Sequence, residues 1–223
     1  MSQKAVIFDM DGLLIDSEPL WQEAGIEALS IYGVKLSVQQ YHSSTGLRTP
    51  EWIEHWFSYF QVDPAFAPNA ISTIEEAAME KISQRGTALP GVHFILDFFR
   101  KQNYRIGIAS SSPQRLIDMV ITKLGIGSYI EETSSAGQLA FGKPHPEVFI
   151  NCAELLQIKP ANCLVFEDSF NGLIAAKAAK MKCVVVPAQD VFHQPKWSAA
   201  DLKLGSLVNF NELLLQAVWM GGE

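Results

Sequence analysis

The sequence of 223 residues has few cysteines, no long apolar segment and no excess of positive charge. Its three cysteines, Cys152, Cys163 and Cys183, stand far apart without a Cys-x-x-Cys pair, which excludes the usual zinc-ligand spacings. A sparse, odd number of cysteines favours a reducing compartment, so we expect a cytoplasmic protein. No stretch approaches the roughly 20 apolar residues of a membrane span, so we expect no membrane partner.

Acidic residues outnumber basic ones by 24 to 17, which gives a formal net charge of −7. An acidic surface repels a phosphate backbone, so nucleic acid is not an expected partner. A small phosphorylated substrate is not excluded, because a metal ion and a local field can override the net charge. The chain has 48% hydrophobic and 18% charged residues, which excludes wholesale disorder.

Short apolar runs rich in β-branched residues recur along the chain, at residues 5–8, 106–109, 164–166 and 184–186. Strands that are covered on both faces have this pattern, which points to a parallel sheet. Helical periodicity separates the later runs, over residues 113–124, 146–157 and 169–180. Strands that alternate with helices predict an α/β fold, a Rossmann-like doubly wound parallel sheet.

One region interrupts this alternation. No strand is predicted between the first apolar run and Tyr104, whereas residues 19–33, 50–61 and 69–84 have helical patterns. Trp52, Ile53, Trp56 and Phe57 form an apolar stripe at helical spacing, which is typical of a helix core. We therefore expect a helical cap domain at residues 16–85, inserted into a core domain of residues 1–15 and 86–223. We expect the protein to be a monomer.

Carboxylates follow two of the predicted strands. Asp9 and Asp11 come directly after the first strand, and Glu167 and Asp168 close the strand that begins at Cys163. The carboxyl ends of parallel strands meet at one edge of a sheet, where ligands bind in open α/β folds. Mg²⁺ takes oxygen ligands and uses one or two carboxylates, so this edge predicts a magnesium site. The alternatives are a strand-ending turn at the first pair and a helix cap at the second.

Two further motifs suit a phosphate group. Ser110 and Ser111 follow a predicted strand and precede a helix that Pro113 opens, with Ser112 as its expected N-cap. Amides at a helix start favour phosphate, although simple capping is about as good an explanation. Lys143 lies between Gly142 and Pro144 and can neutralise a phosphate oxygen, although a lone lysine is more often a solvated surface residue.

Taken together, these motifs resemble those of the haloacid dehalogenase superfamily. The match rests on Asp9-Met10-Asp11-Gly12-Leu13, Ser110, Lys143 and Glu167-Asp168, and it extends over essentially the whole chain, including the inserted helical cap. The stretch from Phe8 to Pro19 is similar to the β-phosphoglucomutase-like branch and, within it, to the sugar and hexitol phosphatases.

This resemblance implies roles for individual residues. Asp9 attacks phosphorus and forms an aspartyl-phosphate, and Asp11 acts as the acid and then the base. Mg²⁺ lies on Asp9, the Asp11 carbonyl and Asp168, with help from Glu167. The phosphoryl oxygens are held by Ser110, Ser111 and Lys143, and the carboxyl groups of Asp9 and Asp11 also contact this group. The cap loop before the second predicted cap helix supplies Arg48, which either binds sugar hydroxyls or is a solvated arginine.

The resemblance leaves rival functions open. Asp11 argues against phosphonatases and dehalogenases, which lack this second aspartate. Mutases carry a histidine early in the first cap helix, where this chain has Trp21, and this difference favours hydrolysis. We therefore expect a Mg²⁺-dependent phosphatase of small phosphorylated sugars or polyols. A sugar phosphomutase is the alternative enzyme, and a non-catalytic phospho-ligand binding protein is the alternative from another class.

Overall fold

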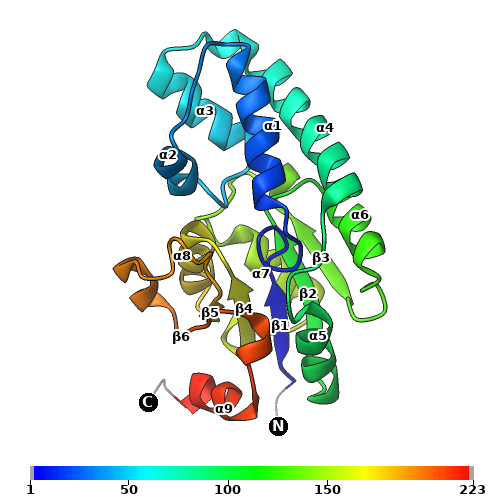
Figure 1. Ribbon diagram of the computed structural model, residues 1–223. Helices are drawn as coiled ribbons and strands as arrows, with labels where there is room; N and C mark the ends of the chain where they lie inside the picture. Colours follow the sequence, from blue (N-terminus) through cyan, green and yellow to red (C-terminus); the bar gives the residue numbers. More distant parts are fainter. Residues whose placement is uncertain (1–2, 221–223) are drawn as a thin grey trace.

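In the computed structural model, which describes residues 3–220, six parallel strands form one sheet (Figure 1). Their order is β3-β2-β1-β4-β5-β6. The strands are β1 (Ala5–Phe8), β2 (Arg105–Ser110), β3 (Glu132–Ser135), β4 (Cys163–Glu167), β5 (Lys182–Val185) and β6 (Leu202–Lys203). The chain runs from β1 outward to β3 and then returns to place β4 on the other side of β1. This reversal between β1 and β4 creates the crevice in which α/β proteins bind ligands.

Alternate residues of the central strand point to opposite faces of the sheet, and each face has its own core. Val6 and Phe8 of β1 join one hydrophobic cluster, which includes side chains of α5 (Val92–Lys101), α6 (Gln114–Leu124) and α9 (Glu212–Met220). Ala5 and Ile7 join the other cluster, with side chains of α7 (Glu147–Leu155) and α8 (Phe170–Ala178). Helices thus cover both faces, and the predicted doubly wound α/β fold is confirmed.

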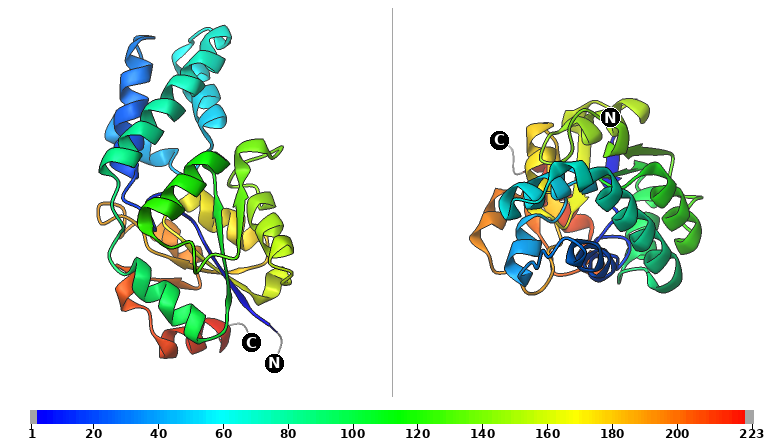
Figure 2. Two further views of the ribbon diagram at one scale, coloured as in Figure 1. Left: turned by 90° about the vertical axis from the view of Figure 1, so that its right-hand side faces the viewer. Right: turned by 90° about the horizontal axis from the view of Figure 1, so that it is seen from above.

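Four of the helices between β1 and β2, all except α5, rise above the carboxyl edge of the sheet (Figures 1 and 2). They are α1 (Glu18–Ser30), α2 (Val38–Ser43), α3 (Thr49–Phe60) and α4 (Ala67–Arg85). Helix α4 packs against α1 and α3. As predicted, the stripe of Trp52, Ile53, Trp56 and Phe57 is buried. We use "the cap" for residues 16–85, the limits expected from the sequence, and "the core" for the remainder.

The structure adds short elements that the sequence patterns did not predict. These are α2, the edge strands β3 and β6, the terminal helix α9, and the 3₁₀ turns η1 (Pro64–Phe66), η2 (Ala136–Gln138), η3 (Pro160–Asn162), η4 (Pro195–Ala199) and η5 (Leu207–Asn209). Strand β3 reads Glu-Thr-Ser-Ser, and β6 has two residues. An edge strand pairs on one side only and needs no continuous apolar run, so such strands give a weak signal in the sequence.

One local expectation was wrong. Ser112 was expected to be the N-cap of the helix that follows β2, but that helix begins at Gln114 with Pro113 in the cap position. The Ser112 hydroxyl instead donates a hydrogen bond to Asp11. A helix cap, the alternative at the second acidic pair, is provided by the following residue, because the Ser169 hydroxyl accepts a hydrogen bond from the Gly172 amide. In the described part of the chain, no helix combines the length and the apolar character that a membrane crossing requires.

Candidate active site

A buried lysine links the ends of β1 and β4. The Lys143 ammonium lies 2.5 Å from Asp9 Oδ1 and 2.7 Å from Glu167 Oε1, and it also donates to the Ala109 carbonyl at 3.2 Å. The Lys143 side chain is 1% exposed. Burial alone lowers the pKa of this lysine, but the carboxylates of Asp9 and Glu167 hold it above its ordinary value. Lys143 is therefore a fixed positive charge at the base of the crevice.

Glu167 is fully engaged by groups of the protein. Its Oε1 accepts from Lys143, while its Oε2 accepts from the amides of Asp168 (2.9 Å) and Ser169 (2.8 Å) and from the Ser169 hydroxyl (3.0 Å). Gly172 leaves room for this carboxylate, because a Cβ at that position would lie 1.6 Å from Glu167 Oε1. This arrangement makes Glu167 a support for Lys143 and for the first turn of α8.

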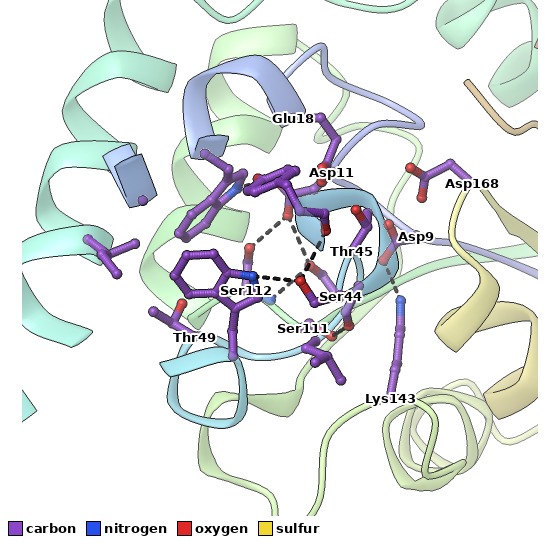
Figure 3. Close-up of a pocket in the computed structure, with 18 residues that line it drawn as sticks. Asp9, Asp11, Glu18, Ser44, Thr45, Thr49, Ser111, Ser112, Lys143 and Asp168 are labelled. Atoms are coloured by element: carbon purple, nitrogen blue, oxygen red, sulfur yellow. Dashed lines mark hydrogen bonds and ion pairs between the residues drawn. The ribbon is translucent and has the colours of Figure 1, made fainter. Parts of the chain in front are cut away.

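Asp168 lies on the opposite side of Asp9 from Lys143 (Figure 3). Its side-chain oxygens accept no hydrogen bond from residues 3–220, and neither does Asp9 Oδ2. Gly12, with φ of +71°, allows the two loops to approach, since a Cβ there would lie 2.3 Å from Asp168 Oδ2. Oxygen atoms of Asp9, Glu167 and Asp168 lie within 4.8 Å of one another.

This donor set fits a magnesium ion. The ligands are hard carboxylate oxygens, and two of the three carboxylates retain unengaged oxygens. Burial is the main cause that raises the pKa of Asp9 to about 8, and the neighbouring Glu167 and Asp11 raise it further while Lys143 lowers it. Burial, followed by the charges of Glu167 and Asp9, raises the pKa of Asp168 well above its ordinary value. One lysine does not compensate the negative charge of these acids, and a bound divalent cation would supply the missing positive charge.

The Asp11 carboxylate joins the cap to the core. Its Oδ1 accepts hydrogen bonds from the Ser17 hydroxyl (2.7 Å) and the Trp21 indole N–H (2.9 Å), both on the cap side. Its Oδ2 accepts from the Ser112 hydroxyl (2.7 Å) and, at 3.4 Å, from the Ser110 hydroxyl. Trp21 and Ser112 lie far apart along the chain, and no sequence pattern connects them. Four donors fix the orientation of this carboxyl group.

The serine cluster after β2 lines the same space. Ser110 accepts a hydrogen bond from the Ser112 amide at 3.0 Å, so its hydroxyl is held between that amide and Asp11. The Ser111 hydroxyl donates to the Gly46 carbonyl of the cap at 2.7 Å. A second contact of this kind joins Asn171 Nδ2 to the Thr45 carbonyl at 2.9 Å. The cap loop is therefore tied to the core directly above the predicted phosphate site.

These groups face a pocket between the cap and the core (Figure 3). Its empty space is about 700 Å³, including the part open to solvent, which is in the range of sites for small ligands. The predicted residues Asp9, Asp11, Ser110, Ser111, Lys143 and Asp168 all line it. Glu167 lies behind Lys143 and does not line the pocket.

Glu18 also lines the pocket, although the sequence patterns did not single it out. It occupies the first position of α1 and faces the carboxylates of the core. Burial, followed by the charges of Asp11 and Asp9, raises the pKa of Glu18 to about 8. Its place in the Asp-Ser-Glu-Pro stretch, two residues before the first apolar cap position, is the only signal that could have marked it.

Arg48 does not reach the pocket. Its guanidinium donates to the carbonyls of Ala136 (3.0 Å) and Leu139 (2.7 Å) and pairs with Glu51 at 2.7 Å. Glu51 in turn accepts a hydrogen bond from the Gly142 amide at 2.8 Å. The arginine that we expected to contact sugar hydroxyls thus holds the cap against the core loop that precedes Lys143.

The fold and the site together define a class of protein, a capped α/β enzyme with a carboxylate and lysine centre at the β1–β4 switch point. A model of the haloacid dehalogenase-like hydrolases matches residues 3–180, and the chain belongs to this family. This confirms the resemblance that the four motifs indicated.

Individual relatives agree with this membership. The chain is 36% identical over 204 residues to hexitol phosphatase B of Escherichia coli, covering 91% of this chain and 92% of that protein. It is 30% identical to a phosphorylated carbohydrates phosphatase of Thermotoga maritima, over 79% of this chain and 81% of that protein. The crystal structure of β-phosphoglucomutase from Clostridium difficile has the same fold, with a TM-score of 0.86 and 23% identity over 99% of this chain and 98% of that chain.

Proposed function

We propose that this protein is a Mg²⁺-dependent phosphatase of small phosphorylated sugars or polyols. The observation that carries the proposal is the juxtaposition of Asp9, Asp168 and Lys143 under a pocket that the cap covers. Family membership supports hydrolysis, and the similarity to hexitol phosphatase B and to a phosphorylated carbohydrates phosphatase supports the substrate class.

In this proposal Asp9 is the nucleophile. Its carboxylate attacks phosphorus, the bond from phosphorus to the leaving oxygen breaks, and an aspartyl-phosphate forms. The nucleophile must be ionised, and the Lys143 ammonium at 2.5 Å counteracts the effect of burial on Asp9. Lys143 and the serines after β2 hold the phosphoryl oxygens during the transfer.

Asp11 is the general acid and base of the proposed reaction. It donates a proton to the leaving sugar oxygen in the first half-reaction, and in the second it accepts a proton from the water that attacks the aspartyl-phosphate. The four donors around its carboxyl group keep it oriented for both steps. Asp9 and Asp168 are the side chains that would hold Mg²⁺, with Glu167 as their neighbour, and the bound ion supplies positive charge for the phosphoryl oxygens.

The test is the release of inorganic phosphate from a panel of hexose, hexitol and pentose phosphates in the presence of Mg²⁺. We expect release from hexose or hexitol phosphates, with loss of at least about 10³-fold in Asp9→Asn, since removal of a covalent nucleophile has effects of this size or larger. Asp118→Asn is the matched control, because Asp118 is an exposed carboxylate on α6 away from the pocket.

Three outcomes would contradict the proposal in whole or in part. If the folded, Mg²⁺-loaded protein released no phosphate from any ester, the phosphatase function would be wrong. An isomerised sugar phosphate in place of free phosphate would instead identify the phosphomutase alternative. Wild-type rates in Asp9→Asn would remove Asp9 from the nucleophile position.

A further inference from the structure

The pocket has a strong imbalance of charge on its walls. Four carboxyl groups line it, from Asp9, Asp11, Glu18 and Asp168. Among the lining residues that the structure describes, Lys143 is the only cation. That lysine is already paired with Asp9 and Glu167. The positive charges of Lys143 and of a bound magnesium ion would therefore be engaged by the carboxylates and by the transferring phosphate.

The cap side of the pocket offers neutral polar groups. Tyr41, Ser44, Thr45 and Thr49 line it, together with Trp21 and Trp52. The Ser44 hydroxyl is held within the cap, because it donates to the Tyr41 carbonyl at 3.0 Å and accepts from the Trp52 indole at 2.9 Å. The Thr45 hydroxyl oxygen is buried and has no hydrogen-bond partner among the described residues. Buried hydroxyls are normally satisfied, so an unpaired one in a ligand pocket indicates a place for a bound polar group. A substrate hydroxyl can donate to it or accept from it.

The arginines close to the pocket form their contacts with other parts of the protein. Arg48 lies between the lining residues Leu47 and Thr49, but its guanidinium is directed to the core carbonyls and to Glu51. Arg115 lies close to the cap and pairs with Glu75 at 3.3 Å. Neither side chain lines the pocket to neutralise an anion.

We propose that the pocket selects phosphate monoesters whose leaving group is an uncharged, polyhydroxylated molecule, and that it rejects esters with a second anionic group. This inference rests on the phosphatase function proposed above. A second carboxylate or phosphate would lose its water shell without gaining a counter-charge. Glu18 provides no compensation in either protonation state, because it repels an anion when ionised and is neutral when protonated.

The shortage of positive charge in the pocket also distinguishes a phosphatase from a phosphomutase. A mutase that moves a phosphoryl group between two hydroxyls through a phosphorylated enzyme forms a bisphosphorylated sugar on the way. Its pocket must hold one phosphate at the nucleophile and the other at the cap side. Among the described residues that line the cap side of this pocket, none carries a positive charge for that second phosphate, and Glu18 carries a carboxyl group.

Matched substrate pairs test the inference. Sorbitol 6-phosphate and 6-phosphogluconate differ only in a terminal alcohol and a terminal carboxylate, and glucose 6-phosphate and glucose 1,6-bisphosphate form a second pair. We expect kcat/KM to be at least about tenfold higher for the member with a single anionic group, which corresponds to about 1.4 kcal/mol. Equal kcat/KM values within either pair would overturn the inference.

p-Nitrophenyl phosphate distinguishes a failure of the phosphatase function from a failure of the charge selectivity, because its leaving group does not need to fit the cap side of the pocket. If the protein hydrolysed neither this ester nor any sugar phosphate, the proposed phosphatase function itself would fail. If it hydrolysed p-nitrophenyl phosphate and both members of each pair equally well, only the inference on charge would fail.

A positive charge added on the cap side of the pocket tests whether the shortage of positive charge causes the selectivity. Thr49→Arg places a cation at a lining position, and Ser58→Arg adds the same charge at an exposed position of the same helix α3. Thr49→Arg should shift the ratio of kcat/KM toward 6-phosphogluconate by about tenfold, and Ser58→Arg should leave the ratio unchanged. If a folded Thr49→Arg protein kept the wild-type ratio, missing positive charge would not be the cause of the selectivity. Should this variant fail to fold, the ratios of the wild-type protein still decide the inference.

Discussion

The hydrogen bond from Trp21 to Asp11 allows a sharp test of the acid–base assignment. Trp21→Phe keeps an aromatic ring on α1 but removes the indole N–H that lies 2.9 Å from Asp11 Oδ1. Asp11 then retains Ser17 at 2.7 Å on the same oxygen and Ser112 at 2.7 Å on the other. The carboxyl group should stay in place but be held less firmly.

The size of the effect follows from these remaining contacts. A hydrogen bond to a charged group contributes about 1.5–3 kcal/mol. Because Ser17 still occupies the same oxygen, we expect the lower end of this range. A cost of about 1.5 kcal/mol in the transition state corresponds to a rate about tenfold lower.

The assay compares two leaving groups. A sugar alkoxide is a poor leaving group and requires a proton from Asp11, whereas p-nitrophenolate leaves without one. The parameter is kcat/KM, because it covers the steps up to the departure of the leaving group and excludes the later hydrolysis of the aspartyl-phosphate. Trp21→Phe should lower kcat/KM about tenfold for a hexitol phosphate and less than about twofold for p-nitrophenyl phosphate.

Trp56→Phe is the matched control. Its indole N–H donates to Ser44 Oγ at 3.2 Å within the cap core, and the residue does not line the pocket. It should therefore change neither kcat/KM by more than about twofold, although it removes the same donor. Equal losses on both substrates in Trp21→Phe would contradict a role of this hydrogen bond in proton transfer, because they would show a general disturbance of the cap.

Three further predictions follow from the site and the core. Treatment with EDTA should abolish phosphate release. Added Mg²⁺ should raise the melting temperature of the wild-type protein but not that of Asp168→Asn, and an equal rise in both proteins would place the ion elsewhere. Gly172→Ala forces the Glu167 carboxylate out of its place and should lower the free energy of unfolding, measured by urea denaturation, by about 3 kcal/mol. Gly127→Ala is the control, because the nearest atom to a new Cβ there is 3.5 Å away, and it should change the free energy of unfolding by less than about 1 kcal/mol. Burial raises the pKa of Asp201, but its hydrogen bonds outweigh burial and hold that pKa below 3.8. Asp201→Asn should therefore lower the free energy of unfolding by about 1 kcal/mol at pH 7. This contribution is lost as the pH falls through the native pKa, so the difference in unfolding free energy between the variant and the wild type should shrink at pH 3.

The central strands and the carboxylates at their ends were predictable because the signals are local. Residues 5–8 and 163–166 form continuous apolar runs, which only strands covered on both faces require. Parallel order then brings the carboxyl ends of these strands together, so Asp9 and Asp168 had to meet at one edge of the sheet. No knowledge of side-chain geometry was needed for that step.

The cap side of the pocket was not predictable in the same way. Glu18 has the same pattern in the sequence as any acidic residue in the first turn of a helix, where carboxylates are common. Its position at the pocket depends on the angle at which α1 leaves the loop after Asp11, and this angle is set by contacts of α1 with α4 and with the hydrophobic cluster of the core. Long-range packing of this kind leaves no periodic signal in the sequence.

The position of Arg48 shows how a nearby residue decides between two interpretations of a sequence. An arginine in a cap loop can turn toward the pocket or toward the core, and its own position does not distinguish these directions. Glu51, three residues later, provides the partner that favours the second direction, at 2.7 Å. To contact a substrate, the guanidinium would have to give up Glu51 and the carbonyls of Ala136 and Leu139, and these carbonyls would then lose their hydrogen bonds from Arg48. The Ala136 carbonyl would keep its hydrogen bond from the Leu139 amide, but the Leu139 carbonyl and the Glu51 carboxylate would lose their contacts with Arg48. Because the loss of a partner from a partly buried polar group is costly, these contacts favour Arg48 as a link between the cap and the core loop that carries Lys143.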